Sequence, residues 1–79
     1  MTMNELEFST SCIGNVADEL HISQSEVYRM LKDSGILSDY IVKYYDVLHT
    51  YGRKYMTNEL ISLLKERKML FVKSEMLVL

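Results

Sequence analysis

The segment VADELHISQSEVYRMLK, residues 16–32, decides the fold, because it contains the end of one helix, a tight turn and the start of a second helix. Ser23 is placed to cap the second helix, and Glu26, three residues later, can reach back to complete a capping box. Ile22 can serve as the hydrophobic staple of the same helix. His21 then falls at the turn itself, where a positive φ is needed that histidine tolerates with some strain.

Helices are also predicted on both sides of this segment. The chain has 79 residues, no proline, only three glycines and 48% apolar residues, which lie mostly at helical spacing. One helix should run from about Asn4 to Leu20, with Leu6 and Ser9 on its inner face, and the next should end at Gly35. The sequence therefore predicts an all-α protein, a compact bundle of four to five helices in a single domain, residues 1–79.

Two further helices are expected downstream. The third should begin at Ser38 as N-cap and end at Gly52, and the fourth should begin at Thr57. The tail KMLFVKSEMLVL, residues 68–79, leaves three alternatives open. The tail could continue the last helix, form a short extended segment or supply a homodimer contact. The spacing of apolar residues in such short runs does not distinguish between these three alternatives.

The composition restricts the function. The N-terminal MTMNELEF carries acids where a targeting sequence has bases, and no apolar run reaches membrane length, so a cytoplasmic protein without membrane contact is expected. The single cysteine, Cys12, lies in an apolar helical row and is expected to be a small buried thiol. Asp46 and His49 share a helix face but lack a third ligand, so His49 is expected to hydrogen-bond near the helix end. We expect no catalytic residues, no metal and no cofactor, and hence no enzyme.

The opening segment resembles helix-turn-helix regulators. Such proteins keep a small residue, a turn residue, an apolar residue next to it and an apolar core residue at fixed spacing, and here these are Ala17, His21, Ile22 and Val27. The resemblance implies a DNA-binding regulator, which is the alternative function. In that alternative the second helix is the recognition helix of a dimer, and its base-contacting residues are Gln24, Ser25, Tyr28 and Arg29.

The charge distribution disfavours nucleic acid as the partner. Residues 1–39 contain seven acids and two bases, a net charge of −5, whereas residues 40–79 contain seven bases and four acids. DNA affinity depends largely on lysine and arginine that neutralise phosphates. The half of the chain that would enter the groove is the acidic half.

The stretch DYIVKYYDVLHTYGRKY, residues 39–55, is rich in tyrosine and interleaved with basic residues. Core packing, a protein interface and stacking on single-stranded nucleic acid are the three roles that fit this pattern. We expect a protein interface as the leading hypothesis, with Ile41, Tyr45 and Leu48 turned toward the core. Its predicted partner-binding residues are Tyr40, Tyr44, Tyr51 and Arg53.

A second resemblance covers roughly Glu5 to Lys68. The blocks EVYRMLKDSGILSDYIVKYYDVLHTYG and KYMTNELISLL are similar to a small bacterial domain-of-unknown-function family. Members are often encoded beside an ADP-ribosyltransferase-like family, so the resemblance implies a partner or neutralising component, as in a toxin–antitoxin pair. The residues that match the family pattern are Val27, Tyr28, Gly35, Tyr40, Tyr44, Tyr45, Leu48, His49, Thr50 and Gly52.

Overall fold

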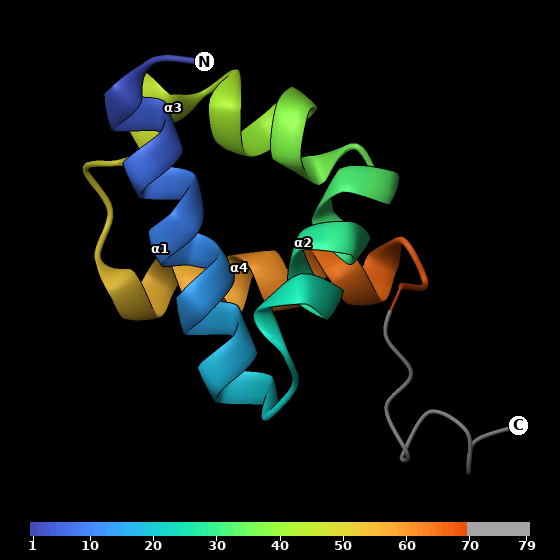
Figure 1. Ribbon diagram of the computed structural model, residues 1–79. Helices are drawn as coiled ribbons and strands as arrows, with labels where there is room; N and C mark the ends of the chain where they lie inside the picture. The colour runs from blue at the N-terminus through green and yellow to red at the C-terminus, as the bar shows by residue number, and fades with distance from the viewer. Residues whose placement is uncertain (70–79) are drawn as a thin grey trace, which may run out of the picture.

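The computed structural model of the protein describes residues 1–69, and this part of the chain contains five helical elements and no strand. They are α1 (Met3–Leu20), α2 (Gln24–Asp33), the π-helix η1 (Leu37–Val42), α3 (Tyr45–Leu48) and α4 (Arg53–Glu66). The predicted all-α bundle of four to five helices is confirmed (Figure 1). The alternatives for the tail fall mainly on residues 70–79, outside the described residues.

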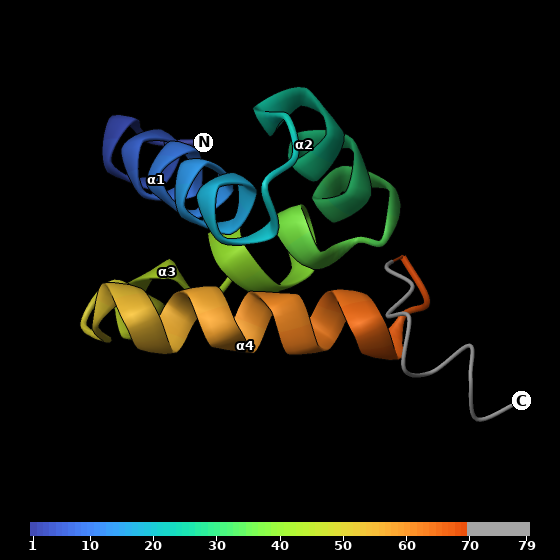
Figure 2. The ribbon, with the colours of Figure 1, turned by 90° about the horizontal axis from the view of Figure 1, so that it is seen from below.

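The helices form two layers around one apolar core. Helix α4 runs along one side of the molecule, and α1 and α2 lie on the other with η1 between them (Figure 2). Helix α1 contacts α4, α2 and η1. Leu6 was expected on the inner face of α1 but is 50% exposed, so the burial of this row begins near Phe8 and Ser9. The buried apolar residues are Cys12, Val16, Ala17, Val27, Leu31, Ile36, Ile41, Leu48, Met56, Leu60 and Leu64.

A tight turn at His21 separates α1 from α2. His21 adopts φ 57° and ψ 43°, the left-handed conformation, and its N–H donates to the carbonyl of Ala17. The N–H of Ile22 donates to the same carbonyl at 3.2 Å, which closes the end of α1. Ser23 caps α2, because its Oγ accepts from the N–H of Glu26 at 3.1 Å.

The second half of the predicted capping box at α2 is wrong. Among the described residues, no hydrogen bond leads from the Ser23 N–H to the Glu26 carboxylate, which lies in an exposed side chain. An exposed carboxylate gains little from such a bond, because it gives up an equivalent bond to water. The complete box lies instead at the start of α1, where Thr2 accepts from the N–H of Glu5 at 3.1 Å and donates its own N–H to Glu5 at 2.8 Å.

The predicted third helix is divided, and Ser38 is not its N-cap. Gly35 ends α2 as expected, with φ +83°, but η1 follows at once, and α3 is a separate short helix. Ile36 and Ile41 are both fully buried although they are five residues apart. Regular α geometry would place them about 140° apart around the helix axis, and the wider i to i+5 turn of a π-helix reduces that angle. Burial of both isoleucines therefore favours the π-helix.

Helix α4 begins four residues earlier than predicted. Gly52 is its N-cap, with φ −68° and ψ 157° and no side chain to bond the first amides. Thr57, the expected start of the helix, is buried within it, and its Oγ1 donates to the carbonyl of Arg53 at 2.8 Å. A threonine hydroxyl bonded this way is compatible with a helix interior, which is why Thr57 does not interrupt α4. Leu60 and Leu64 are fully buried on its inner face.

Candidate partner-binding surface and charged cleft

Exposed apolar side chains gather between η1 and the first turn of α4. Tyr44, Val47, Tyr51 and Tyr55 are 47%, 54%, 44% and 54% exposed. The backbone between the first three is a run of tight turns, in which the N–H of Leu48 donates to Tyr44 and the N–H of Tyr51 donates to Leu48. We call these four residues, together with the half-buried Tyr40, the tyrosine surface. Since three of its tyrosines are this exposed, core packing does not account for them.

The rings of this surface are paired. Tyr40 and Tyr44 have ring centroids 6.3 Å apart, and Tyr51 and Tyr55 have centroids 4.9 Å apart with planes tilted by 47°. Burial raises the pKa of Tyr40, and nearby Glu59, Tyr55 and Tyr51 raise it further. Because these charge effects act over short range, the two pairs belong to one surface.

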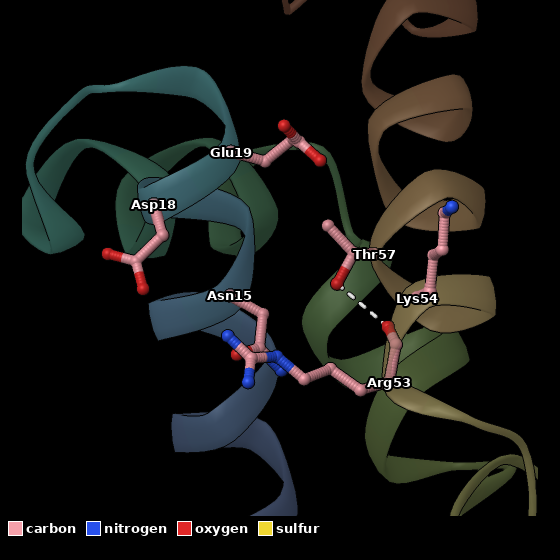
Figure 3. A pocket seen from close by; sticks show the side chains of 6 residues that line it. All are labelled: Asn15, Asp18, Glu19, Arg53, Lys54 and Thr57. Atoms are coloured by element: carbon pink, nitrogen blue, oxygen red, sulfur yellow. Dashed lines mark hydrogen bonds between the residues drawn. The ribbon is translucent and has the colours of Figure 1, made fainter.

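Of the predicted partner-binding residues, Tyr40, Tyr44 and Tyr51 belong to the tyrosine surface. The side chain of Arg53 instead extends toward α1 (Figure 3). Tyr55, which was not in the predicted set, completes the second ring pair. Helical spacing could not have identified it, because Tyr51 lies before α4 and Gly52 is the N-cap between the two tyrosines.

The residues expected to face the core do so to different degrees. Ile41 and Leu48 are buried, and Tyr45 is half-buried with its ring edge-on to Phe8 at 5.5 Å. His49 stacks on Tyr45 at 4.6 Å, and its Nδ1 donates to the Tyr45 carbonyl at 2.8 Å. The expected hydrogen bond of His49 near the helix end is therefore confirmed. Within residues 1–69, no group of three or more potential ligands is close enough to hold a metal ion.

The four residues of the DNA-binding alternative share the outer face of α2. Gln24, Ser25, Tyr28 and Arg29 are all exposed. The ammonium of Lys32 lies 6.0 Å from the centre of the Tyr28 ring, so this face also carries a second base. Within residues 1–69, these four side chains of the helix are open to solvent.

An open cleft of about 430 Å³ separates the last turns of α1 from the first turns of α4. One wall consists of Asn15, Asp18 and Glu19, and the other of Arg53, Lys54 and Thr57 (Figure 3). Glu19 points toward α4, and the guanidinium of Arg53 extends across the cleft toward Asn15. The cleft is thus lined by two acids from α1 and two bases from α4, and the guanidinium of one of these bases lies on the α1 side. It could not be predicted from the sequence, because Asn15 and Arg53 lie 38 positions apart along the chain.

The comparisons with known proteins give one match. The family model described as "Protein of unknown function (DUF3791)" matches residues 7–67. No curated protein and no solved structure matches the chain. Among the helices of residues 1–69, none combines the length and the apolar character that a membrane crossing requires.

Proposed function

Since the chain belongs to this family of proteins of unknown function, we propose that it is a small protein–protein interaction module that binds its partner through the tyrosine surface. The observation that carries the proposal is the set of four large apolar side chains, 44–54% exposed, between residues 44 and 55. Exposed apolar patches of this kind mark interaction sites in soluble proteins. Tyrosine is also among the residues enriched at interface hot spots.

The ring pairs support the same function. A tyrosine side chain has only two rotatable torsions, so it buries a large area at a small cost in conformational entropy. Tyr51 and Tyr55 already hold each other at 4.9 Å before any partner binds. Preorganised side chains of this kind lose less freedom on binding, which favours affinity.

The family resemblance gives the proposal a partner. We propose a bacterial cytoplasmic protein pair, in which this module neutralises an ADP-ribosyltransferase-like protein and performs no catalysis itself. A small module can block a larger enzyme simply by covering the surface around its active site. Three exposed tyrosines and a valine are suited to such a contact, because apolar rings desolvate well and each hydroxyl can still find a hydrogen-bond partner.

The test is affinity capture with the tagged full-length chain from cells that produce it, followed by binding measurements on the captured protein. Tyr51→Ala and Tyr55→Ala should weaken binding by roughly tenfold or more each. Tyr28→Ala is the matched control, because Tyr28 is equally exposed, at 46%, but lies on α2. Equal binding by all four proteins, wild type included, would rule out the tyrosine surface as the interface.

The DNA-binding regulator remains a second candidate, supported by the exposure of Gln24, Ser25, Tyr28 and Arg29 on α2. In this candidate the chain forms a homodimer and α2 enters the major groove. A salt titration of binding to genomic DNA fragments tests it. Phosphate contacts predict a steep loss of affinity as salt rises, and the Arg29→Gln variant should reduce that slope. Weak binding that does not depend on salt would eliminate this function.

A further inference from the structure

An acidic side chain lies beside the tyrosine surface. Glu59 follows Tyr55 by four residues in α4, the spacing at which two side chains are neighbours on one helical face. Burial raises the pKa of Tyr40, and the charge of Glu59 raises it further, so the carboxylate is also close to that phenol. Glu59 therefore lies next to tyrosines from two elements, η1 and α4.

This carboxylate has no cation of its own within the described residues. The positions three and four residues away along α4 hold Tyr55, Met56, Ser62 and Leu63, and none of these is a base. Among residues 1–69, no lysine, arginine or histidine forms a salt bridge with Glu59. The side chain is nevertheless half-buried, which reduces the water available to solvate its charge. A cation supplied by another molecule would compensate for that loss.

The tyrosine rings beside Glu59 are accessible to such a cation. Tyr51 and Tyr55 are both exposed, and their ring centroids are 4.9 Å apart. Since these rings already contact each other, a cation cannot enter between them and must lie on an outward ring face. The other end of the surface already contains this kind of interaction, because the ammonium of Lys43 lies 5.5 Å from the centre of the Tyr44 ring. Lys43 also repels a second cation from Tyr44, which leaves the end near Glu59 as the available one.

We propose that the partner presents an arginine to this end of the tyrosine surface, with its guanidinium on the ring of Tyr55 and paired with the carboxylate of Glu59. Arginine suits the position better than lysine, because its planar guanidinium stacks on aromatic faces, is weakly hydrated and donates two parallel hydrogen bonds to a carboxylate. Arginine and tyrosine are also both enriched at interface hot spots. The inference rests on the proposed function, since it names the chemistry of the partner that the surface binds.

The experiment is an NMR titration of the full-length chain at pH 7 with the peptide acetyl-Gly-Arg-Gly-amide. The matched control peptide carries citrulline in place of arginine, which keeps the planar shape of the side chain and removes its charge. Saturable shifts are expected at the amides of Tyr55 and Glu59 and at the ring protons of Tyr55. The arginine peptide should bind roughly threefold to tenfold more tightly than the citrulline peptide. Equal binding of the two peptides, or no saturable shift at these residues, would overturn the proposal.

Variants identify the group that recognises the charge. Glu59→Gln should weaken binding of the arginine peptide roughly threefold to fivefold and leave binding of the citrulline peptide unchanged. Glu66→Gln is the matched control, because Glu66 is an exposed acid about two turns further along α4, and this variant should bind normally. Lys43→Gln should bind the arginine peptide at least as tightly as the wild type does, since it removes a like charge. Undiminished binding of the arginine peptide by Glu59→Gln would overturn the proposal.

The captured partner distinguishes a failure of this inference from a failure of the proposed function. If Tyr51→Ala and Tyr55→Ala weaken partner binding but Glu59→Gln does not, the tyrosine surface is the interface and the assignment of an arginine to it is wrong. If the two tyrosine variants bind the partner normally, the proposed function is wrong and this inference fails with it. Weaker partner binding by all three variants, with normal binding by Glu66→Gln, is the expected result.

Discussion

Arg67 donates from Nη1 to the backbone carbonyl of Ser34 at 2.7 Å, and this bond joins the C-terminal ends of α4 and α2 across 33 residues of sequence. Ser34 is the C-cap of α2, and its hydroxyl donates to the carbonyl of Leu31 at 3.2 Å. A guanidinium placed there satisfies a carbonyl that has no partner within the helix and lies at the negative end of the helix dipole. The contact therefore holds two helix ends together and stabilises one of them.

Arg67→Met should lower the free energy of unfolding by about 1 kcal/mol, because it removes a charged hydrogen bond at a solvent-exposed site. Urea unfolding followed by circular dichroism measures the change. Lys65→Met is the control: Lys65 is exposed in the last turn of α4 and should change stability by less than about 0.5 kcal/mol. Equal stability of the Arg67 variant and the wild type would mean that the bond contributes nothing in solution.

Ser23→Ala should cost on the order of 1 kcal/mol, because the N–H of Glu26 loses the side-chain oxygen that accepts from it. Ser25→Ala provides a matched control two residues later, where the serine is exposed inside the helix and alanine has the higher helix propensity. Thermal unfolding of the two variants makes the comparison. A Ser23→Ala midpoint as high as that of Ser25→Ala would contradict the capping role.

His21→Gly should leave stability unchanged or raise it slightly, because glycine adopts the left-handed conformation of this residue without strain. His21→Val should instead lose about 1–2 kcal/mol, since a β-branched side chain is poorly compatible with φ 57°. Denaturant midpoints of the two variants test the turn directly. A glycine variant that is clearly less stable than the valine variant would show that the conformation of His21 does not limit stability.

Cys12 should react slowly with thiol reagents in the folded protein at pH 8 and rapidly in urea. The side chain is 5% exposed, and desolvation raises the pKa of its thiol from 9.0 to about 11. The unfolded chain ionises first, so unfolding releases a proton between these two values and stability falls as the pH rises through them. The contribution reaches roughly 1.4 kcal/mol per pH unit. Cys12→Ala should lack this part of the alkaline loss, and an identical pH dependence in both proteins would contradict the assignment.

The ends of several helices could be predicted from the sequence because their signals are local. The cap at Ser23, the left-handed turn at His21 and the stop at Gly35 each depend on hydrogen bonds or backbone preferences within about five residues. The capping box at Thr2 and Glu5 is of the same kind, and its pattern could have been recognised. The sequence also showed that residues 40–55 are unusual in tyrosine content.

The division of the predicted third helix depended on the tertiary structure. The π-helix arises where Ile36 and Ile41 must both enter the core, a requirement set by α1 and α2. The start of α4 at Gly52 likewise could not be recognised from a capping side chain, since glycine has none. Local propensity is a weak determinant at such positions, and packing against neighbouring helices overrides it.

By itself the sequence determined the all-α class, the turn at residues 21–23 and the tyrosine-rich segment, because helix period and capping are encoded in neighbouring residues. Only the tertiary structure decided which tyrosines face solvent, that Arg53 crosses to α1, and that Arg67 reaches Ser34. The two arginine contacts join residues that are 33 or more positions apart in the sequence, as in the bond from Arg67 to Ser34. Their geometry follows from how the helices pack over a shared core, and no local pattern specifies it.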